Sequence, residues 1–345
     1  CPRQEVATWK PDFQKSWTPG VHVVHKIKKY SKKMSTLKIQ KDYPLAPLTT
    51  FKIGGNAKAY VQVESASEVV EAIEYAKHHE IPAFLLGGGS NVLFSDTGFP
   101  GLVIHLVSTA IEISHQKLTA SSGANLLDVV MALEEVGLAG MERLSGIPGT
   151  LGGAVRGNAG AFGAEISDFL KVVVAVNLRT GILKSFTKEE CQFSYRDSYF
   201  KKEKDWAIVT AEFYLTQTAP TEHLATIRKE TMTLRESKHP QDAWCAGSFF
   251  MNPLVHNQDL LDEFMRDKGF PSKDGKLPAG WLIDHVGLRG KKIGGAQVSP
   301  HHPNYIINTG KATASHVVML SSLVKTRVRD ELGVRLQEEV QMVGF

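Results

Sequence analysis

Two glycine-rich segments about sixty residues apart could bind an anion through their backbone N–H groups. The first glycine segment is LGGGSN at residues 86–91, and the second is GIPGTLGGAVRGNAGAFG at residues 146–163. Turns rich in glycine can form concave anion sites without any cationic side chain. Tight turns would explain either segment alone, because glycine is common in turns. Two long segments in one chain favour a bound dinucleotide-type cofactor whose diphosphate they hold from both sides.

Two common phosphate-binding motifs do not fit these segments. A Rossmann site needs G-x-G-x-x-G between a strand and a helix, but the sixth position from Gly87 is Val92, and the residues after it are apolar and strand-like. A Walker A loop needs a second glycine five residues after the first, then Lys-Ser/Thr. Leu151 holds that place after Gly146, and Ala154 holds it after Gly149. We therefore do not expect ATP-driven phosphoryl transfer.

Alternating strands and helices flank the first glycine segment. Residues 59–63 alternate like a strand, and the following stretch opens with a Ser cap and has helical periodicity. Its predicted buried face comprises Val69, Ala72, Ile73 and Ala76. The buried strand 81–86 then leads into the glycine turn. Residues 101–107 and 111–123 predict two further strands, and a helix beginning near Asn125 ends at Gly137.

The region after the second glycine segment predicts a hairpin turning at Thr180-Gly181, a strand at 207–216 and a long helix at 221–238. The apolar spacing of that helix places four side chains on one face, namely Leu224, Ile227, Thr231 and Leu234. We expect a domain boundary near residue 220. The remainder predicts three helices and two strands, hence a mixed α and β lobe: helices at 260–269, 279–288 and 314–333, strands at 304–308 and 335–344.

Composition narrows the function further. The chain has 345 residues, 42% hydrophobic and 22% charged, with a net charge of only +4. Because it has no apolar run of ~18 residues, we expect no membrane insertion. Because its net charge is low, we expect no nucleic-acid partner. Its three cysteines have no zinc-type spacing, which predicts no metal site and a reducing, cytoplasmic setting.

The first 34 residues, which include HKIKKYSKK, do not match the pattern of the domains that follow, and we interpret them as an extension that is not part of those domains. The alternative is a basic arm that binds a partner. Met34 is a plausible start of the natural protein.

Seven motifs occur in the order known from one enzyme family. They are TTFKIGGNA (49–57), LLGGGSNVLFSD (85–96), LSGIPGTLGGAVRGNAGAFGAEI (144–166), CQFSYRDSYFK (191–201), AGSFFMNP (246–253), PAGWLIDHVGLRGKKIGGAQV (278–298) and LQEEV (336–340). Over about residues 35–345 the chain resembles the UDP-N-acetylenolpyruvoylglucosamine reductase family. The resemblance implies an FAD- and NADPH-dependent flavoenzyme that makes UDP-N-acetylmuramate for peptidoglycan.

The same resemblance implies an α+β fold. A PCMH/vanillyl-alcohol-oxidase-type FAD-binding domain of two small α+β subdomains would occupy 35–220, and a C-terminal α+β substrate-binding lobe would occupy 221–345. The last strand would return Glu339 to the active site. FAD would bind non-covalently, NADPH would reduce it and leave, and the enolpyruvyl nucleotide would enter the same cleft. We expect a monomer with small-molecule partners alone.

Three catalytic residues follow from the resemblance. Reduction delivers a hydride to C3 of the enolpyruvyl group and a proton to C2, and negative charge develops on the carboxylate. Arg196 in FSYRDS would bind that carboxylate through its planar guanidinium, and Ser248 in AGSFF would donate the proton. Glu339 in LQEEV would assist, which predicts a raised pKa. Glu338 would face the opposite way in a strand, so the choice between them depends on register.

The remaining site residues form two groups. The predicted FAD-binding residues are Thr50, Ile53, Gly54, Leu86, Gly87, Gly88, Gly89, Ser90, Asn91, Gly146, Ile147, Pro148, Gly149, Gly152, Ala154 and Asn158. The predicted substrate-binding residues are Tyr195, Lys238, Asn252, Lys276 and His302. An exposed charge explains Lys238, Lys276 and His302 equally well.

Two features depart from the family pattern. Met251 stands where the family usually has lysine, and the short link from residue 216 to the helix at 221 has no room for a tyrosine-bearing substrate loop. Two alternatives stay open. One is a PCMH-type oxidase that uses oxygen, although such oxidases often tether FAD through histidine and neither glycine segment contains one. The other is a non-catalytic flavoprotein or sugar-nucleotide binding module.

Overall fold

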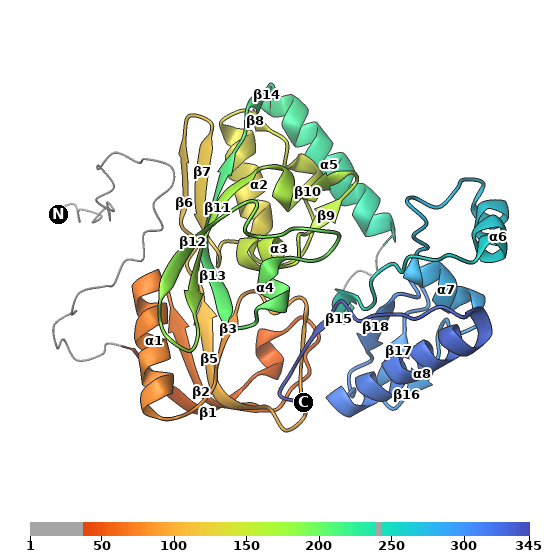
Figure 1. The fold of residues 1–345 in the computed structure, drawn as a ribbon, viewed down its shortest axis with the longest axis horizontal. Helices are drawn as coiled ribbons and strands as arrows, with labels where there is room; N and C mark the ends of the chain where they lie inside the picture. Colours follow the sequence, from red (N-terminus) through yellow and green to blue (C-terminus); the bar gives the residue numbers. More distant parts are fainter. Residues whose placement is uncertain (1–36, 239–242) are drawn as a thin grey trace.

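The computed structural model describes residues 37–238 and 243–345, which form two sheet-containing subdomains and a C-terminal lobe (Figure 1). The sheets have the strand orders β1-β2-β5-β3, β12-β11-β13-β7-β6 and β15-β18-β17-β16. Each sheet is accompanied by helices, which agrees with the predicted α+β class. The extension at residues 1–34 lies outside the described residues.

In the first subdomain, strand β3 ends at the first glycine segment. Strand β3 runs parallel to β5, which runs parallel to β2, while β1 pairs antiparallel with β2. Helix α1 starts where the Ser65 side chain accepts a hydrogen bond from the backbone N–H of Glu68, and its predicted apolar face is buried. The bounds are β1 Gln40–Pro44, the 3-10 helix η1 Ala46–Leu48, β2 Asn56–Val63, α1 Ala66–His78, β3 Ala83–Leu86 and β5 Phe99–Leu106.

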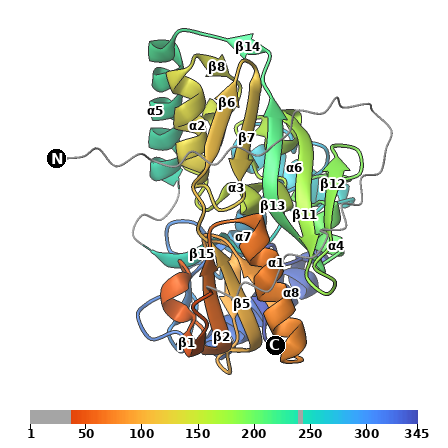
Figure 2. The same ribbon diagram turned by 90° about the vertical axis from the view of Figure 1, so that its left-hand side faces the viewer.

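The second subdomain contains the second glycine segment and an antiparallel five-stranded sheet. Helices α2 and α5 lie side by side next to this sheet (Figure 2). The strands are β6 Ile111–Ser114, β7 Lys117–Ser121, β11 Leu170–Asn177, β12 Leu183–Thr187 and β13 Trp206–Tyr214. The helices are α2 Leu126–Glu135, η2 Glu142–Leu144, α3 Leu151–Arg156, η3 Ile166–Asp168, α4 Tyr199–Lys202 and α5 Thr221–Lys238. Two short pairs complete it, β8 Leu138–Ala139 with β14 Gln217–Thr218 and β9 Gly160–Ala161 with β10 Ala164–Glu165.

The C-terminal lobe packs its helices against its own sheet around an apolar core that also includes Phe51, Ile53 and Leu93 of the first subdomain. Helix α8 has a capping box formed by Thr313 and His316, and it ends at Gly333 in the left-handed conformation, as helix-end chemistry predicts. The strands are β15 Trp244–Ser248, β16 Lys292–Ile293, β17 Ala296–Val298 and β18 Tyr305–Asn308. The helices are α6 Gln258–Lys268, α7 Ala279–His285 and α8 Ala314–Leu332.

The end of the chain ties the C-terminal lobe back to the first subdomain. Strand β19, Gln341–Val343, pairs in parallel with β4, Val92–Phe94, which directly follows the first glycine segment. In Figure 1 the C-terminal segment runs from the lobe toward the sheet that contains β2 and β5. The Asp96 carboxylate also accepts hydrogen bonds from the N–H groups of Ala314 (2.7 Å) and Ser315 (2.9 Å) at the start of α8.

Three sequence predictions need correction. Residues 111–123 form a two-stranded hairpin, β6 and β7, rather than one strand. The predicted strand at 335–344 is reduced to β19, because the backbone before it makes only isolated contacts with residues 249–251. Leu234 is 40% exposed, so it does not belong to the buried face of α5.

The true buried face of α5 joins the helix to the second subdomain. Leu224 and Thr231 are buried, and Arg228 Nε lies 2.7 Å from a carboxylate oxygen of Glu134 in α2. Arg235 lies against Gly146 of the second glycine segment. Packing therefore places α5 against the second subdomain, and the domain boundary near residue 220 stays a prediction.

No helix within residues 37–238 and 243–345 has the length and apolar character needed to cross a bilayer. Within the same two ranges, His, Cys, Asp and Glu side chains form no group of three that could hold a metal ion.

Candidate active site

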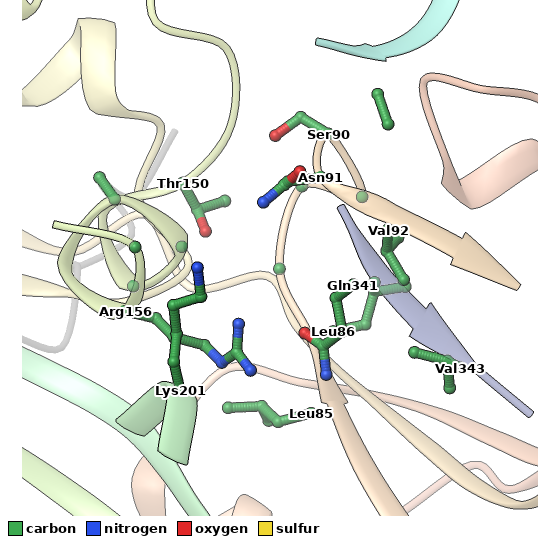
Figure 3. A pocket seen from close by; sticks show the side chains of 18 of the residues that line it. Leu85, Leu86, Ser90, Asn91, Val92, Thr150, Arg156, Lys201, Gln341 and Val343 are labelled. Carbon is green, nitrogen blue, oxygen red and sulfur yellow. The ribbon is translucent and has the colours of Figure 1, made fainter. Parts of the chain in front are cut away.

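A large cavity of about 1100 Å³ brings the two glycine segments together with residues of the C-terminal lobe. Its walls come from both subdomains, from β15 and β18, and from residues 339–344. Figure 3 shows the first glycine segment with Ser90 and Asn91, the opposite wall with Thr150, and β19 with Gln341 and Val343 beside it. A volume of this size accommodates a large ligand.

The two glycine segments pack directly against each other. The Ser90 hydroxyl donates to the Pro148 carbonyl at 2.9 Å. Gly149 has φ +116°, and a Cβ there would meet the Ser90 hydroxyl at 2.4 Å; a Cβ on Gly89 would lie 2.1 Å from the Leu48 carbonyl. Contacts within the protein and a positive φ therefore favour glycine at these two positions.

Unused donors line this part of the cavity. Within the described residues, the backbone N–H groups of Gly88, Gly89, Ser90 and Asn91 donate to no protein acceptor. The buried Thr150 hydroxyl also has no hydrogen-bond partner there. Consecutive free N–H groups form an anion site, and a buried hydroxyl without a partner is costly unless a ligand satisfies it. These donors fit the diphosphate of FAD.

Ten of the sixteen predicted FAD-binding residues line the cavity, and six do not. The ten are Leu86, Gly87, Gly88, Gly89, Ser90, Asn91, Ile147, Pro148, Gly152 and Ala154. The six are Thr50, Ile53, Gly54, Gly146, Gly149 and Asn158, and the FAD-binding role of all sixteen residues stays a prediction. The Asn158 side chain donates to Glu165 (2.9 Å) and to the Ser194 carbonyl (3.0 Å), so it acts inside the protein.

Arg196 is held in a fixed position at the cavity wall. Its backbone is in the left-handed region, φ +55°, which is uncommon for a side-chain-bearing residue. Its guanidinium donates to the carbonyl oxygens of Asn158 (3.3 Å) and Gly160 (2.6 Å), and its Nε lies 3.6 Å from Oε1 of Glu339. These contacts use part of its donor set and leave N–H groups for a ligand.

Glu339 is brought to Arg196 by the returning C-terminal segment. Its N–H donates to the Phe249 carbonyl at 2.8 Å, and its carbonyl accepts from the Asn91 side chain at 3.2 Å. Burial raises the pKa of Glu339 above 4.5, although Arg196 and Lys201 oppose that rise. The raised pKa was predicted. The neighbouring Glu338 accepts from Lys325 at 2.8 Å instead, so the register presents Glu339 to the cavity.

Ser248 lines the same cavity from the end of β15. It is paired across the sheet with Tyr305 of β18, whose side chain also lines the cavity. Burial raises the pKa of Tyr305 to about 12, and nearby Arg235 and the Ser248 side chain partly offset this. A neutral phenol therefore stands beside the predicted proton donor. Sequence reasoning missed Tyr305, because nothing in NYIIN distinguishes it from a core aromatic residue.

Only some of the predicted substrate-binding residues line the cavity. Tyr195 and Asn252 line the cavity, and Lys276 Nζ lies 4.2 Å from the centre of the Tyr195 ring. The Asn252 side chain accepts from the N–H of Ala279 at 2.9 Å. Lys276 and His302 are outside the cavity wall, and burial lowers the pKa of His302.

Lys238 ends α5, and its side chain lies outside the described part of the structure. Among the described residues, six cations that line the cavity were not singled out by sequence analysis, including Arg156, Lys201 and Arg235. One signal was present, because Arg156 is the only charged residue of the second glycine segment. With Arg196 they make the cavity electropositive, which suits anionic ligands.

Comparisons with known proteins agree with this arrangement. A family model described as FAD binding domain matches residues 57–186, and one described as UDP-N-acetylenolpyruvoylglucosamine reductase, C-terminal domain, matches residues 239–343. The second match begins after α5. Together with the fold, these matches confirm the PCMH-type FAD-binding domain and FAD as the cofactor.

Relatives match over nearly their whole length. A UDP-N-acetylenolpyruvoylglucosamine reductase from Solibacter usitatus is 35% identical over 309 residues, which cover 89% of this chain and 97% of that protein. The enzyme of that name from Carboxydothermus hydrogenoformans is 38% identical over 321 residues, covering 92% and 98%. The crystal structure of UDP-N-acetylenolpyruvylglucosamine reductase from Thermus caldophilus superposes with a TM-score of 0.69 at 29% identity, covering 89% of this chain and 98% of that one.

Proposed function

Because the chain belongs to the UDP-N-acetylenolpyruvoylglucosamine reductase family of FAD-dependent oxidoreductases, we propose that it uses NADPH to reduce the enolpyruvyl group of UDP-N-acetylenolpyruvoylglucosamine. The product would be UDP-N-acetylmuramate. One observation carries the proposal: Arg196, Ser248 and Glu339, from three distant parts of the chain, line the cavity that the glycine segments also line.

Each of these residues has a task that its surroundings support. The glycine segments would hold FAD, which, once reduced by NADPH, would supply the hydride for C3 of the enolpyruvyl group. The Ser248 hydroxyl donates the proton that C2 receives, so the C2–C3 double bond becomes a single bond. Arg196 stabilises the negative charge that develops on the carboxylate. Its bonds to Asn158 and Gly160 fix it beforehand, which keeps the cost of reorganisation low.

Glu339 is the third residue of the proposed catalytic site, beside Arg196 and Ser248. Because burial raises its pKa, the protonated carboxyl is favoured more than for an exposed glutamate. A neutral carboxyl donates a hydrogen bond and does not repel the substrate carboxylate. Arg235 extends the positive wall of the cavity toward the nucleotide diphosphate of the substrate. Tyr195, Asn252 and Lys276 are the further substrate contacts that we propose.

The proposal extends to the oligomeric state of the enzyme and to its location in the cell. We further propose that the enzyme acts as a monomer and that its partners are small molecules alone. We place the enzyme in the cytoplasm, where NADPH and UDP-sugars are made.

The absorbance spectrum of the purified protein tests the proposal. We expect a flavin spectrum, anaerobic bleaching by NADPH and full recovery on addition of UDP-N-acetylenolpyruvoylglucosamine. UDP-N-acetylglucosamine is the matched control and should leave the bleached spectrum unchanged. Colourless protein, or flavin that NADPH does not bleach, would support a binding module instead. Flavin that stays attached after denaturation and recovers only with oxygen would support an oxidase.

A further inference from the structure

Arg156 places a positive charge inside the cavity from the last turn of α3. Its backbone is fixed there, because its carbonyl accepts a hydrogen bond of 2.6 Å from the Ser198 hydroxyl. Figure 3 shows the Arg156 side chain projecting from one wall of the cavity toward Leu86 and Gln341, whereas the neighbouring Lys201 side chain points toward Thr150. All five of these side chains line the cavity.

The Arg156 guanidinium has no protein partner among the described residues. No hydrogen bond or ion pair joins it to residues 37–238 or 243–345. Asp197 is the one acid that favours its charge, and that carboxylate lies 3.1 Å from Lys202 Nζ. Burial lowers the pKa of Arg156 to about 10, so it stays charged at neutral pH. Arg156 is half-buried, and a partly desolvated charge without a hydrogen-bonded partner is costly, which points to a negative group of a ligand.

The position of Lys201 shows which end of the cavity this is. The Lys201 ammonium donates to the Arg196 carbonyl at 2.7 Å, and it interacts electrostatically with Glu339 and with Arg156. Arg156 therefore lies within electrostatic range of Lys201, which contacts Arg196 at the reacting centre. The free N–H groups of residues 88–91 can hold a diphosphate without it.

The isoalloxazine ring gains negative charge when FAD is reduced. Hydride transfer from NADPH brings two electrons and one proton, which yields NADP⁺ and a reduced flavin with one more negative charge unless a second proton binds. Charge near the ring nitrogens tunes the electronics of a flavin. We propose that Arg156 is the counter-charge for reduced FAD and makes the bound flavin easier to reduce. This inference rests on the proposed function, in which FAD occupies the cavity.

The test compares how tightly oxidised and reduced FAD bind. In Arg156→Gln, we expect the dissociation constant of reduced FAD to rise at least tenfold more than that of oxidised FAD. For a two-electron couple this ratio lowers the midpoint potential of the holoenzyme by ~30 mV. Arg156→Lys keeps the charge and should change the ratio less than threefold. Arg329→Gln is the matched control, because Arg329 is exposed and paired with Asp330.

Both constants are measured by titrating apo-protein with FAD, oxidised or photoreduced, so loss of cofactor on purification does not prevent the comparison. An equal rise in the two constants, with an unchanged potential, would overturn the proposal and assign Arg156 to the diphosphate. No change in either constant would also overturn it. Failure of the proposed function looks different: the flavin would bind, and its potential would respond, but the enolpyruvyl nucleotide would not reoxidise it.

Discussion

The Nε atom of Arg196 lies 3.6 Å from Oε1 of Glu339, although the two residues belong to different parts of the fold. Arg196 sits in a left-handed turn of the second subdomain, and Glu339 arrives only because β19 pairs with β4. The pair therefore depends on the return of the C-terminal segment to the first glycine segment, so the polar end of the cavity is complete only in the assembled chain.

Replacing Glu339 tests whether this carboxyl acts in the reaction. We expect Glu339→Gln to lower kcat by ~10²-fold, the scale found for one preorganised group that stabilises developing charge. Steady-state kinetics with the enolpyruvyl nucleotide measure this effect. Glu338→Gln is the control, since Glu338 contacts Lys325 instead, and it should stay within about twofold. Equal losses in the two variants would assign the effect to the segment rather than to the carboxyl.

The raised pKa of Glu339 also predicts how stability depends on pH. A folded-state pKa above the unfolded value means that folding favours the protonated form. The stabilising contribution is therefore present below the unfolded pKa and is lost as pH rises through the folded pKa. Apo-protein with Glu339→Gln should gain stability relative to wild type as pH rises from about 4 to 8. Urea unfolding at several pH values measures the difference, and a pH-independent difference would refute this account of Glu339.

Asp96 is predicted to have the opposite pH dependence. Burial would raise its pKa, but hydrogen bonds from Ser315 and Ala314 outweigh burial and lower it. Its stabilising contribution is present above the unfolded pKa and is lost as pH falls through the folded pKa. We expect Asp96→Ala to cost ~1 kcal/mol at neutral pH, the scale of a lost helix-terminus partner. The exposed control Asp330→Ala should change the free energy of unfolding by under ~0.5 kcal/mol.

The pair formed by Arg228 and Glu134 should hold α5 on α2. Arg228 Nε lies 2.7 Å from one carboxylate oxygen of Glu134, and Arg228 Nη2 lies 3.4 Å from the other. The Arg228 side chain is only 16% exposed and the Glu134 side chain 14%. Arg228→Met would leave Glu134 without its partner and should lower the free energy of unfolding by ~2 kcal/mol. Thermal or urea unfolding measures this loss. A loss no larger than that of Arg329→Met would show that the pair behaves like a surface ion pair.

Local chemistry in the sequence predicted much of the fold. The buried face of α1, the end of α2 at Gly137 and the span of α8 follow from apolar periodicity and capping residues. The failed Rossmann count at Val92 agrees with the structure, because β4 follows the first glycine segment where a helix would be needed. These features depend on residues that are close in sequence.

The predictions failed where contacts between residues far apart in the sequence determine which side chains are buried. Apolar spacing alone placed Leu234 on the buried face of α5, but that face contains Arg228 and Arg235, which contact Glu134 and Gly146. Their burial depends on partners far along the chain. The same holds for the cavity cation Arg156 and for Tyr305, whose surroundings no local pattern reveals.

Ser248→Ala, studied in separate half-reactions, tests the central claim most directly. The claim is that residues of this cavity protonate the substrate while FAD reduces it. Stopped-flow absorbance should show bleaching by NADPH within about twofold of wild type, and reoxidation by UDP-N-acetylenolpyruvoylglucosamine slower by ~10²-fold or more, the usual range for loss of a general acid. Reoxidation at the wild-type rate would contradict the role of Ser248 and the account of the site.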